Sequence, residues 1–160
     1  MIINLSGEVD YKMFNHLVTS FNNLKKGDNI HIYFSSPIGG YIDSTTALID
    51  FINKNKEYIG VTFYGELFSS GMTVFLSLQC EKKILPETTG MYHFAWQSMN
   101  ISETGKPNGE YDGFVIKEMK KSKMRTLEFL NTTKLSEKEI AKIKLGKDVY
   151  FSYDRMLELI

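Results

Sequence analysis

The sequence predicts an α/β fold with a mostly parallel sheet. Segments that alternate apolar and polar residues, typical of strands, take turns with segments whose apolar residues recur every three or four positions, typical of helices. The strand–helix–strand order repeats along the first half of the chain. Because parallel strands need a long connection, usually a helix, this repetition predicts parallel pairing with right-handed crossovers. Ligands of such sheets bind at the carboxyl ends of the strands.

The first repeat begins with a short strand at residues 2–5, which Gly7 ends. Asp10 can cap the helix that follows, because its carboxylate can accept from a free backbone N–H group. Residues 30–34 alternate apolar and polar side chains and are rich in strand formers, so they are expected to form the second strand. The inward face of the intervening helix is expected to contain Met13, Phe14, Leu17, Val18, Phe21 and Leu24.

The second helix is expected to start at Asp43 or Ser44. A third strand follows at 59–64, and Gly65 is expected to end it in a turn. Residues 70–79 then form a third helix. The inward residues of the second helix are Leu48, Ile49, Phe51 and Ile52.

Two further strands are expected at 82–85 and 91–96, and a long helix at 114–130. Residues 98–112 are polar and contain glycine and proline, so they are expected to form a variable loop.

The end of the chain carries two capping signals. Ser136 and Glu139 have the spacing of a capping box for a helix at 137–144. Residues 149–151 are expected to be extended, and Ser152 can cap a last helix that reaches Leu159.

Composition narrows the possible functions. The 160 residues fit a single domain, 1–160. Nineteen basic residues balance nineteen acidic ones, so no global charge favours nucleic acid or an acidic membrane. The single cysteine, Cys80, excludes an internal disulfide and a multi-cysteine zinc site. No apolar stretch approaches the length needed to cross a bilayer, and no leader is evident, so a soluble cytoplasmic protein is expected.

Residues 65–71, which join a strand to a helix, are the first candidate for a catalytic site. Ser69 at such a junction can simply cap the helix. It can also be a nucleophile, because free N–H groups at a helix start can stabilise an oxyanion. The residues alone leave both interpretations open.

Two other segments lie at the same sheet edge. Residues 36–40 are either a plain turn or a loop whose glycines, Gly39 and Gly40, let backbone amides approach a substrate carbonyl. His93 is either a core side chain or a base that reaches the Ser69 helix. The residues alone do not select an acid among the aspartates.

Six segments, in this order, resemble the proteolytic subunit of the Clp protease, within the ClpP/crotonase superfamily. The opening strand ends in a glycine, a strand leads into a loop with Pro and Gly-Gly, and a helix follows. A glycine-flanked serine, a Leu-Pro…His element and an Asp-x-x-x-Ser element complete the set. These segments are 2–9, 31–40, 47–50, 65–71, 85–93 and 148–152. The resemblance implies the superfamily's repeated β-β-α layers and a serine endopeptidase.

The resemblance also implies site residues. Ser69 would be the nucleophile, His93 the general base and acid, and Asp148 the carboxylate that orients the histidine. The oxyanion would be held by the amide of Gly39 or Gly40 and by that of Ser70. No metal and no cofactor is implied.

Several partners follow from the resemblance. They are a peptide or unfolded-protein substrate and further copies of the chain in a ring, with no nucleic acid and no membrane. A Clp ATPase is the weakest of these expectations, because the family's N-terminal segment that meets the ATPase has no match in the sequence.

The sequence departs from the family pattern near the serine. Leu67 and Phe68 replace two alanines, and Ser70 replaces a methionine, so the nucleophile is Ser69 or Ser70, with the spacing in favour of Ser69. Segment 98–112 replaces a glycine-rich strand that binds substrate in the family. Two alternatives stay open: a catalytically inactive subunit, and a crotonase-like acyl-CoA enzyme.

Overall fold

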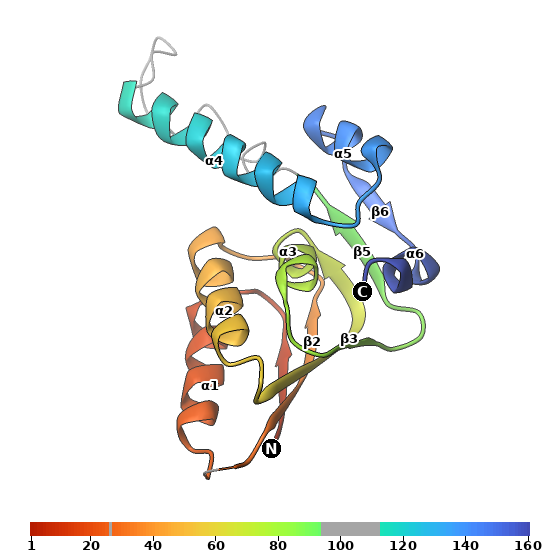
Figure 1. Cartoon of the computed structure of the whole chain (residues 1–160). Helices are drawn as coiled ribbons and strands as arrows, with labels where there is room; N and C mark the ends of the chain where they lie inside the picture. The colour runs from red at the N-terminus through yellow and green to blue at the C-terminus, as the bar shows by residue number, and fades with distance from the viewer. Residues whose placement is uncertain (26, 94–112) are drawn as a thin grey trace. The chain divides into compact units, whose positions relative to one another are not determined.

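The computed structural model describes residues 1–25, 27–93 and 113–160, with backbone only at 113–120 and 122. Contacts divide the chain into two compact units. Figure 1 shows the helices and strands along the chain. The first unit comprises Met1–Tyr92 and Tyr150–Ile160, and the second comprises His93–Val149. The single-domain interpretation stays a prediction.

A six-stranded sheet forms the frame of the first unit. Its strand order is β1-β2-β3-β5-β6, and β4 pairs with β3 as well. The pairs β1–β2, β2–β3, β3–β4 and β3–β5 are all parallel, which confirms the predicted mostly parallel sheet. The strands are β1 (Ile2–Ser6), β2 (Ile30–Ser36), β3 (Ile59–Phe68), β4 (Lys82–Ile84), β5 (Thr89–Tyr92) and β6 (Val149–Phe151).

Helices connect these strands as the sequence predicts. They are α1 (Tyr11–Asn22), α2 (Ile42–Lys54), α3 (Ser70–Ser77) and α6 (Tyr153–Glu158). Asp10 caps α1 by accepting from the Met13 N–H at 2.9 Å, as expected. The predicted start of α2 at Asp43 or Ser44 is wrong by one or two residues. Ser44 does not cap the helix, because its hydroxyl instead donates to the Val9 carbonyl at 2.7 Å.

Aromatic rings fill the space between the sheet and α3. Phe63 on β3 contacts Phe34 on β2 and Phe75 on α3, with ring centroids 5.6 and 5.0 Å apart. All three rings are fully buried. Edge-to-face pairs of this kind each add about 0.5–1.5 kcal/mol to the burial of the rings. The carboxyl end of β3 is therefore fixed firmly against α3.

The prediction that Gly65 ends the third strand is wrong. β3 continues through Gly65 to Phe68. The pairing with β2 jumps from Phe34–Phe63 to Ser36–Leu67, so β3 contains extra residues at this point. Gly65 has φ +65°, a conformation that glycine adopts without strain, and it forms a bulge in place of a turn. The bulge lets β3 go on to pair with β5 before the chain enters α3.

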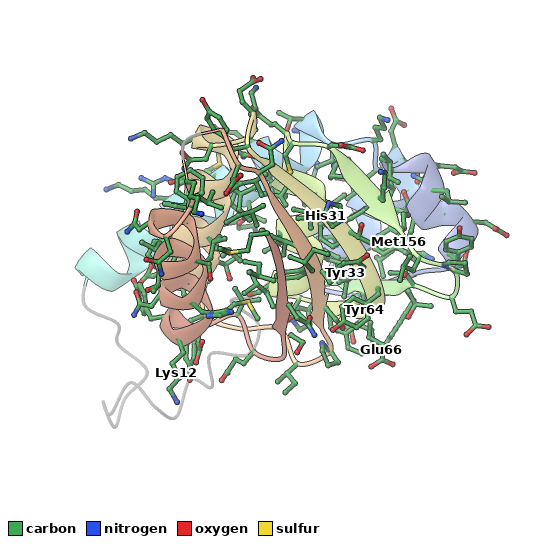
Figure 2. All side chains as sticks on the ribbon, turned by 90° about the horizontal axis from the view of Figure 1, so that it is seen from below. Lys12, His31, Tyr33, Tyr64, Glu66 and Met156 are labelled. Carbon is green, nitrogen blue, oxygen red and sulfur yellow. The ribbon has the colours of Figure 1, made fainter. Side chains whose placement is uncertain are left out.

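The opposite face of the sheet carries polar and aromatic side chains. Figure 2 shows His31, Tyr33, Tyr64 and Glu66 along β2 and β3, while Lys12 extends from α1. The His31 ring is hydrogen-bonded to the Thr62 hydroxyl at 2.8 Å and meets the Tyr33 ring edge to face. The hydrogen bond gives the His31 ring nitrogen and the Thr62 hydroxyl a partner on this face of the sheet.

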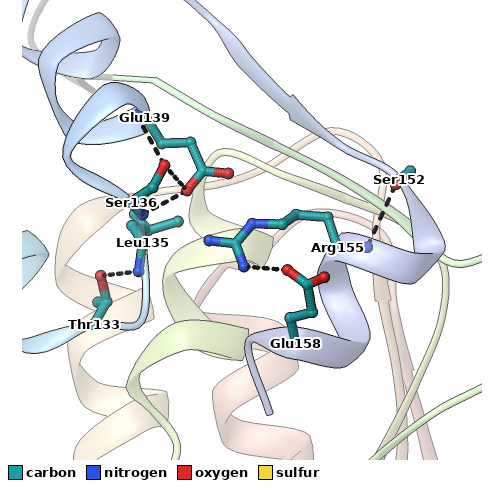
Figure 3. A network of polar contacts seen from close by, with 7 residues as sticks. All are labelled: Thr133, Leu135, Ser136, Glu139, Ser152, Arg155 and Glu158. Carbon is teal, nitrogen blue, oxygen red and sulfur yellow. Dashed lines mark hydrogen bonds and ion pairs between the residues drawn. The ribbon is translucent and has the colours of Figure 1, made fainter.

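The second unit contains α4 (Gly113–Thr132) and α5 (Glu137–Lys144). The predicted capping box is confirmed: the Ser136 hydroxyl accepts from the Glu139 N–H, and the Glu139 carboxylate accepts from the Ser136 N–H at 2.7 Å (Figure 3). The predicted cap of α6 by Ser152 is also present, at 3.4 Å from the Arg155 N–H. The expected strand at 94–96 and the variable loop at 98–112 lie outside the described residues.

The described residues contain neither a candidate membrane-spanning helix nor a candidate metal site. No helix there is both long and apolar enough to cross a membrane. Within the same ranges, no three His, Cys, Asp or Glu side chains are grouped so that they could hold a metal ion.

Candidate active site

Ser69 occupies the junction between β3 and α3 in an unusual backbone conformation. Its φ is 51° and its ψ is −109°, one of two non-glycine residues with positive φ in the described part of the chain. Such a conformation costs on the order of 1–3 kcal/mol. The Ser69 side chain makes no capping hydrogen bond to α3, so the capping interpretation is not supported. In α/β-hydrolases, a serine on a strained strand-to-helix turn is the exposed nucleophile.

Backbone hydrogen bonds hold Ser69 in this conformation. Its N–H donates to the Met91 carbonyl on β5 at 2.8 Å, and its carbonyl accepts from the Thr73 N–H on α3 at 3.0 Å. Tyr92, which follows Met91, is buried, and burial raises the pKa of its phenol, while a hydrogen bond with the Thr73 side chain opposes that rise. β3, β5 and α3 thus fix the junction from three sides.

The loop at residues 36–40 lies against Ser69. Gly39 has φ +85°, and a Cβ built on it would lie 3.0 Å from the Ser69 Cβ and 3.5 Å from its Oγ. Glycine is required here both by the backbone angle and by the space. The Gly39 carbonyl accepts from the Val9 N–H at 2.8 Å and from the Ser36 hydroxyl at 3.1 Å. The backbone of the loop is therefore fixed beside the Ser69 side chain.

Several backbone N–H groups are available near Ser69. Among the described residues, no hydrogen bond has the N–H of Gly39 or of Gly40 as its donor. Ser70 is the first residue of α3, where N–H groups have no partner within the helix. The positive end of the helix dipole adds to the attraction of this position for negative charge. Charge that develops on a carbonyl oxygen beside Ser69 could be stabilised here.

His93 and Asp148 lie together in the second unit. The His93 Nδ1 is 3.3 Å from the Asp148 Oδ1. His93 directly follows β5, and Asp148 directly precedes β6, so the ends of two strands set their positions. A carboxylate at Nδ1 favours the tautomer whose proton is on Nδ1, so that the lone pair on Nε2 can accept a proton. His93 can therefore act as a general base whose ring is held in one orientation by the Asp148 carboxylate.

The structure thus brings the predicted site residues together in two groups. Ser69, Ser70, Gly39 and Gly40 meet in the first unit, and His93 meets Asp148 in the second. Of the two bulky residues before the serine, Leu67 is fully buried, so its bulk belongs to the core of the first unit.

Two residues that support the loop, Val9 and Ser44, could not be assigned this role from the sequence. Val9 forms a bridge with Gly40, and Ser44 donates to the carbonyl of Val9. These partners are more than 30 residues apart in the chain, and the local pattern around Val9 gives no sign of the contact. Only the pairing of the folded chain identifies them.

Comparison with known proteins agrees with this architecture. A similar fold is found in the ClpP protease catalytic domain from Plasmodium falciparum, with a TM-score of 0.66 and 22% identity over 99% of this chain and 80% of that one. A ClpP1 mutant from Listeria monocytogenes has a TM-score of 0.67 and 20% identity over 99% of this chain and 86% of that one. No curated protein sequence gives a significant match.

The sequence itself also matches a family model. That model describes the Clp protease, and the match extends over residues 1–157, nearly the whole sequence. The chain therefore belongs to the Clp protease family.

Proposed function

We propose that this protein is a serine endopeptidase of the Clp proteolytic-subunit type. The observation that carries the proposal is the conformation of Ser69: a strained residue without a capping hydrogen bond, with Gly39 packed against its side chain. A serine that only capped α3 would need neither the strain nor the glycine contact. The contact between His93 and Asp148 and the family match add independent support.

In the proposed reaction, Ser69, His93 and Asp148 act as a triad. The Ser69 Oγ attacks the carbonyl carbon of the scissile peptide bond while His93 Nε2 takes the hydroxyl proton. Asp148 holds the other ring nitrogen and stabilises the imidazolium that forms. His93 then gives the proton to the departing amine, which leaves an acyl-enzyme on Ser69.

Water completes the cycle by the reverse roles. His93 removes a proton from water, the hydroxide attacks the ester, and Ser69 regains its proton as the peptide acid leaves. In both steps the oxyanion is held by the Ser70 N–H and by the N–H of Gly39 or Gly40. The contact of Gly39 with Ser69 favours Gly39 as the loop donor. The loss of one such donor typically lowers kcat about 10²–10³-fold.

The proposal includes self-assembly and a peptide or unfolded-protein substrate. The chain carries no net charge, so little electrostatic repulsion opposes association of copies. Native mass spectrometry of the purified protein measures the state directly. We expect a closed ring; a stable monomer would contradict this part of the proposal.

The proposed activity is tested by labelling with a fluorophosphonate, which reacts with activated serines. The native oligomer is labelled beside Ser69→Ala, and the site is read by intact mass and peptide mapping. The matched control is Ser77→Ala, which removes a serine hydroxyl from the last turn of the same helix. We expect one addition at Ser69 in the native protein and in Ser77→Ala, and none in Ser69→Ala.

Other outcomes contradict the proposal in distinct ways. Addition at Ser70 would show that the nucleophile is the neighbouring serine. A folded ring that is not labelled and cleaves no peptide would indicate the inactive-subunit alternative. Faster hydrolysis of acyl-CoA thioesters than of peptides would indicate the crotonase-like alternative.

A further inference from the structure

The side chain of Ser70 connects α3 to the loop at residues 36–40. Its hydroxyl donates a hydrogen bond to the Gly40 carbonyl at 3.0 Å. Ser70 is only 7% exposed, so water competes little for this hydroxyl. The bond therefore joins two segments that are 30 residues apart in the chain.

The bond acts on the Gly40–Tyr41 peptide unit, which adjoins the unit that carries the Gly40 N–H and lies two units after the one that carries the Gly39 N–H. A trans peptide is rigid and planar, so a bond to the Gly40 carbonyl fixes the plane between Gly40 and Tyr41. The other end of that plane is the Tyr41 N–H, which donates to the Val9 carbonyl at 3.0 Å. The preceding plane is fixed through the Gly39 carbonyl, which accepts from Val9 and from Ser36. Of the hydrogen bonds just named, all between described residues, the one from Ser70 comes from α3.

Ser70 thus has two connections to one site. Its N–H lies at the start of α3, beside Ser69, and its hydroxyl holds the loop that contains Gly39 and Gly40. The distance between two oxyanion donors on separate segments depends on whatever joins those segments. In this chain the Ser70 hydroxyl joins them directly.

We propose that Ser70 is a positioning residue, whose hydroxyl sets the separation between the loop amides and the start of α3. This inference rests on the proposed peptidase activity. Ser70 acts through Gly40 and takes no part in proton transfer. Without the hydroxyl, the loop can move away from Ser69 and the oxyanion is held less well, while binding of the ground-state substrate is unchanged. kcat therefore falls and KM stays the same.

The expected size follows from one neutral hydrogen bond. Its net contribution corresponds to a change in rate of about three- to tenfold. This is smaller than the loss expected when a donor itself is removed.

The test uses two variants and one control in the full-length native oligomer. Ser70→Ala removes the hydroxyl, and Ser70→Cys keeps the size of the side chain with a much weaker donor. The control is Ser35→Ala: Ser35 is also 7% exposed, and its hydroxyl donates to the Glu66 carbonyl at 3.4 Å, so it joins β2 to β3 and not the loop to α3. Circular dichroism checks that each variant is folded.

Four quantities are measured: the rate of fluorophosphonate labelling at Ser69, kcat and KM on a fluorogenic peptide, and the rate of amide hydrogen exchange of residues 36–41. We expect both Ser70 variants to label about three- to tenfold more slowly, with a lower kcat, an unchanged KM and faster exchange of the loop. Ser35→Ala is expected to match the native protein in labelling rate.

The inference is overturned if the Ser70 variants label at the native rate, or if Ser35→Ala is slowed equally. A native protein that is not labelled and cleaves no peptide would instead overturn the proposed function, and this inference with it. The two failures are therefore told apart by the native sample alone.

Discussion

The two units position their site residues by different means. In the first unit, backbone hydrogen bonds from β5 and α3 fix Ser69, and Gly39 packs against it. In the second unit, His93 and Asp148 meet through their side chains, which are 30% and 49% exposed. A polar contact between side chains this exposed is worth about 0–1 kcal/mol. The serine group is thus set by the backbone of the fold, whereas the contact of the base with its acid depends on side chains in reach of water.

This difference predicts which substitutions would disrupt each half of the candidate site. The serine half is Ser69 with the loop at residues 36–40, and the histidine half is His93 with Asp148. Changes of shape should damage the serine half, because its geometry depends on close backbone approach. Changes of charge should damage the histidine half, because its orientation depends on a carboxylate. The predictions below test this division, and all that concern activity rest on the proposed function.

The largest effect is expected from Asp148→Asn. The amide keeps the size of the side chain but stabilises the wrong tautomer of His93, which in a serine triad lowers kcat on the order of 10⁴-fold. Steady-state cleavage of a fluorogenic peptide measures the loss. The control is Asp154→Asn, which removes an equal charge from the first turn of α6. Activity of Asp148→Asn close to native would remove Asp148 from the site.

Gly39→Ala keeps the backbone N–H but is expected to displace it, and kcat/KM should fall by up to about 10²–10³-fold, the cost of an oxyanion donor that no longer reaches its acceptor. The added Cβ must push against the Ser69 Cβ, 3.0 Å away, at a φ that favours glycine. Gly27→Ala is the matched control, because Gly27 also has a positive φ, +94°, but a Cβ there meets nothing within 4 Å. Equal losses in the two variants would show that backbone strain alone, and not the contact with Ser69, causes the effect.

Ser136→Ala is expected to lower the free energy of unfolding by about 1 kcal/mol, because it removes the cap of α5. Urea denaturation followed by circular dichroism measures this. Asp10→Ala, which removes the cap of α1 in the first unit, should have an effect of similar size. If both variants shift one common transition, the units unfold together; if each shifts a separate transition, the single-domain prediction for residues 1–160 fails.

The smallest effect on activity is expected at Cys80. The thiol is buried, and this burial raises its pKa, so the fraction of thiolate near neutral pH is below that of an exposed cysteine. Ellman's reagent should react slowly with the folded protein and rapidly after denaturation, and the slow rate should rise with pH as the thiol ionises. Cys80→Ala should keep the native kcat/KM. A fast reaction of the folded protein at neutral pH would contradict the inferred burial.

The sequence predicted elements whose signals are local. The helix caps at Asp10, Ser136 and Ser152 were found because a capping residue and its helix are adjacent in the chain. Parallel pairing followed from the order of the elements. These predictions needed no knowledge of distant partners.

Features that depend on distant partners could not be predicted. Gly65 has the same local appearance in a turn and in a bulge, and only the register of β3 against β2 decides between them. The role of Ser69 depended on its backbone angles, which the surrounding elements impose. The support of Gly40 by Val9 joins segments whose sequences carry no sign of each other.

The position of Asp148 has a consequence for protein synthesis. The strained serine, its loop and His93 are all encoded within the first 93 residues, whereas Asp148 directly precedes β6, the strand beside β5 at the end of the sheet order. Domains begin to fold while the ribosome is still extending them. A nascent chain can therefore form the Ser69 turn long before the acid emerges, and under the proposed function it stays inactive until the strand at the sheet edge is made. The order of the chain alone would then protect neighbouring nascent proteins from premature cleavage.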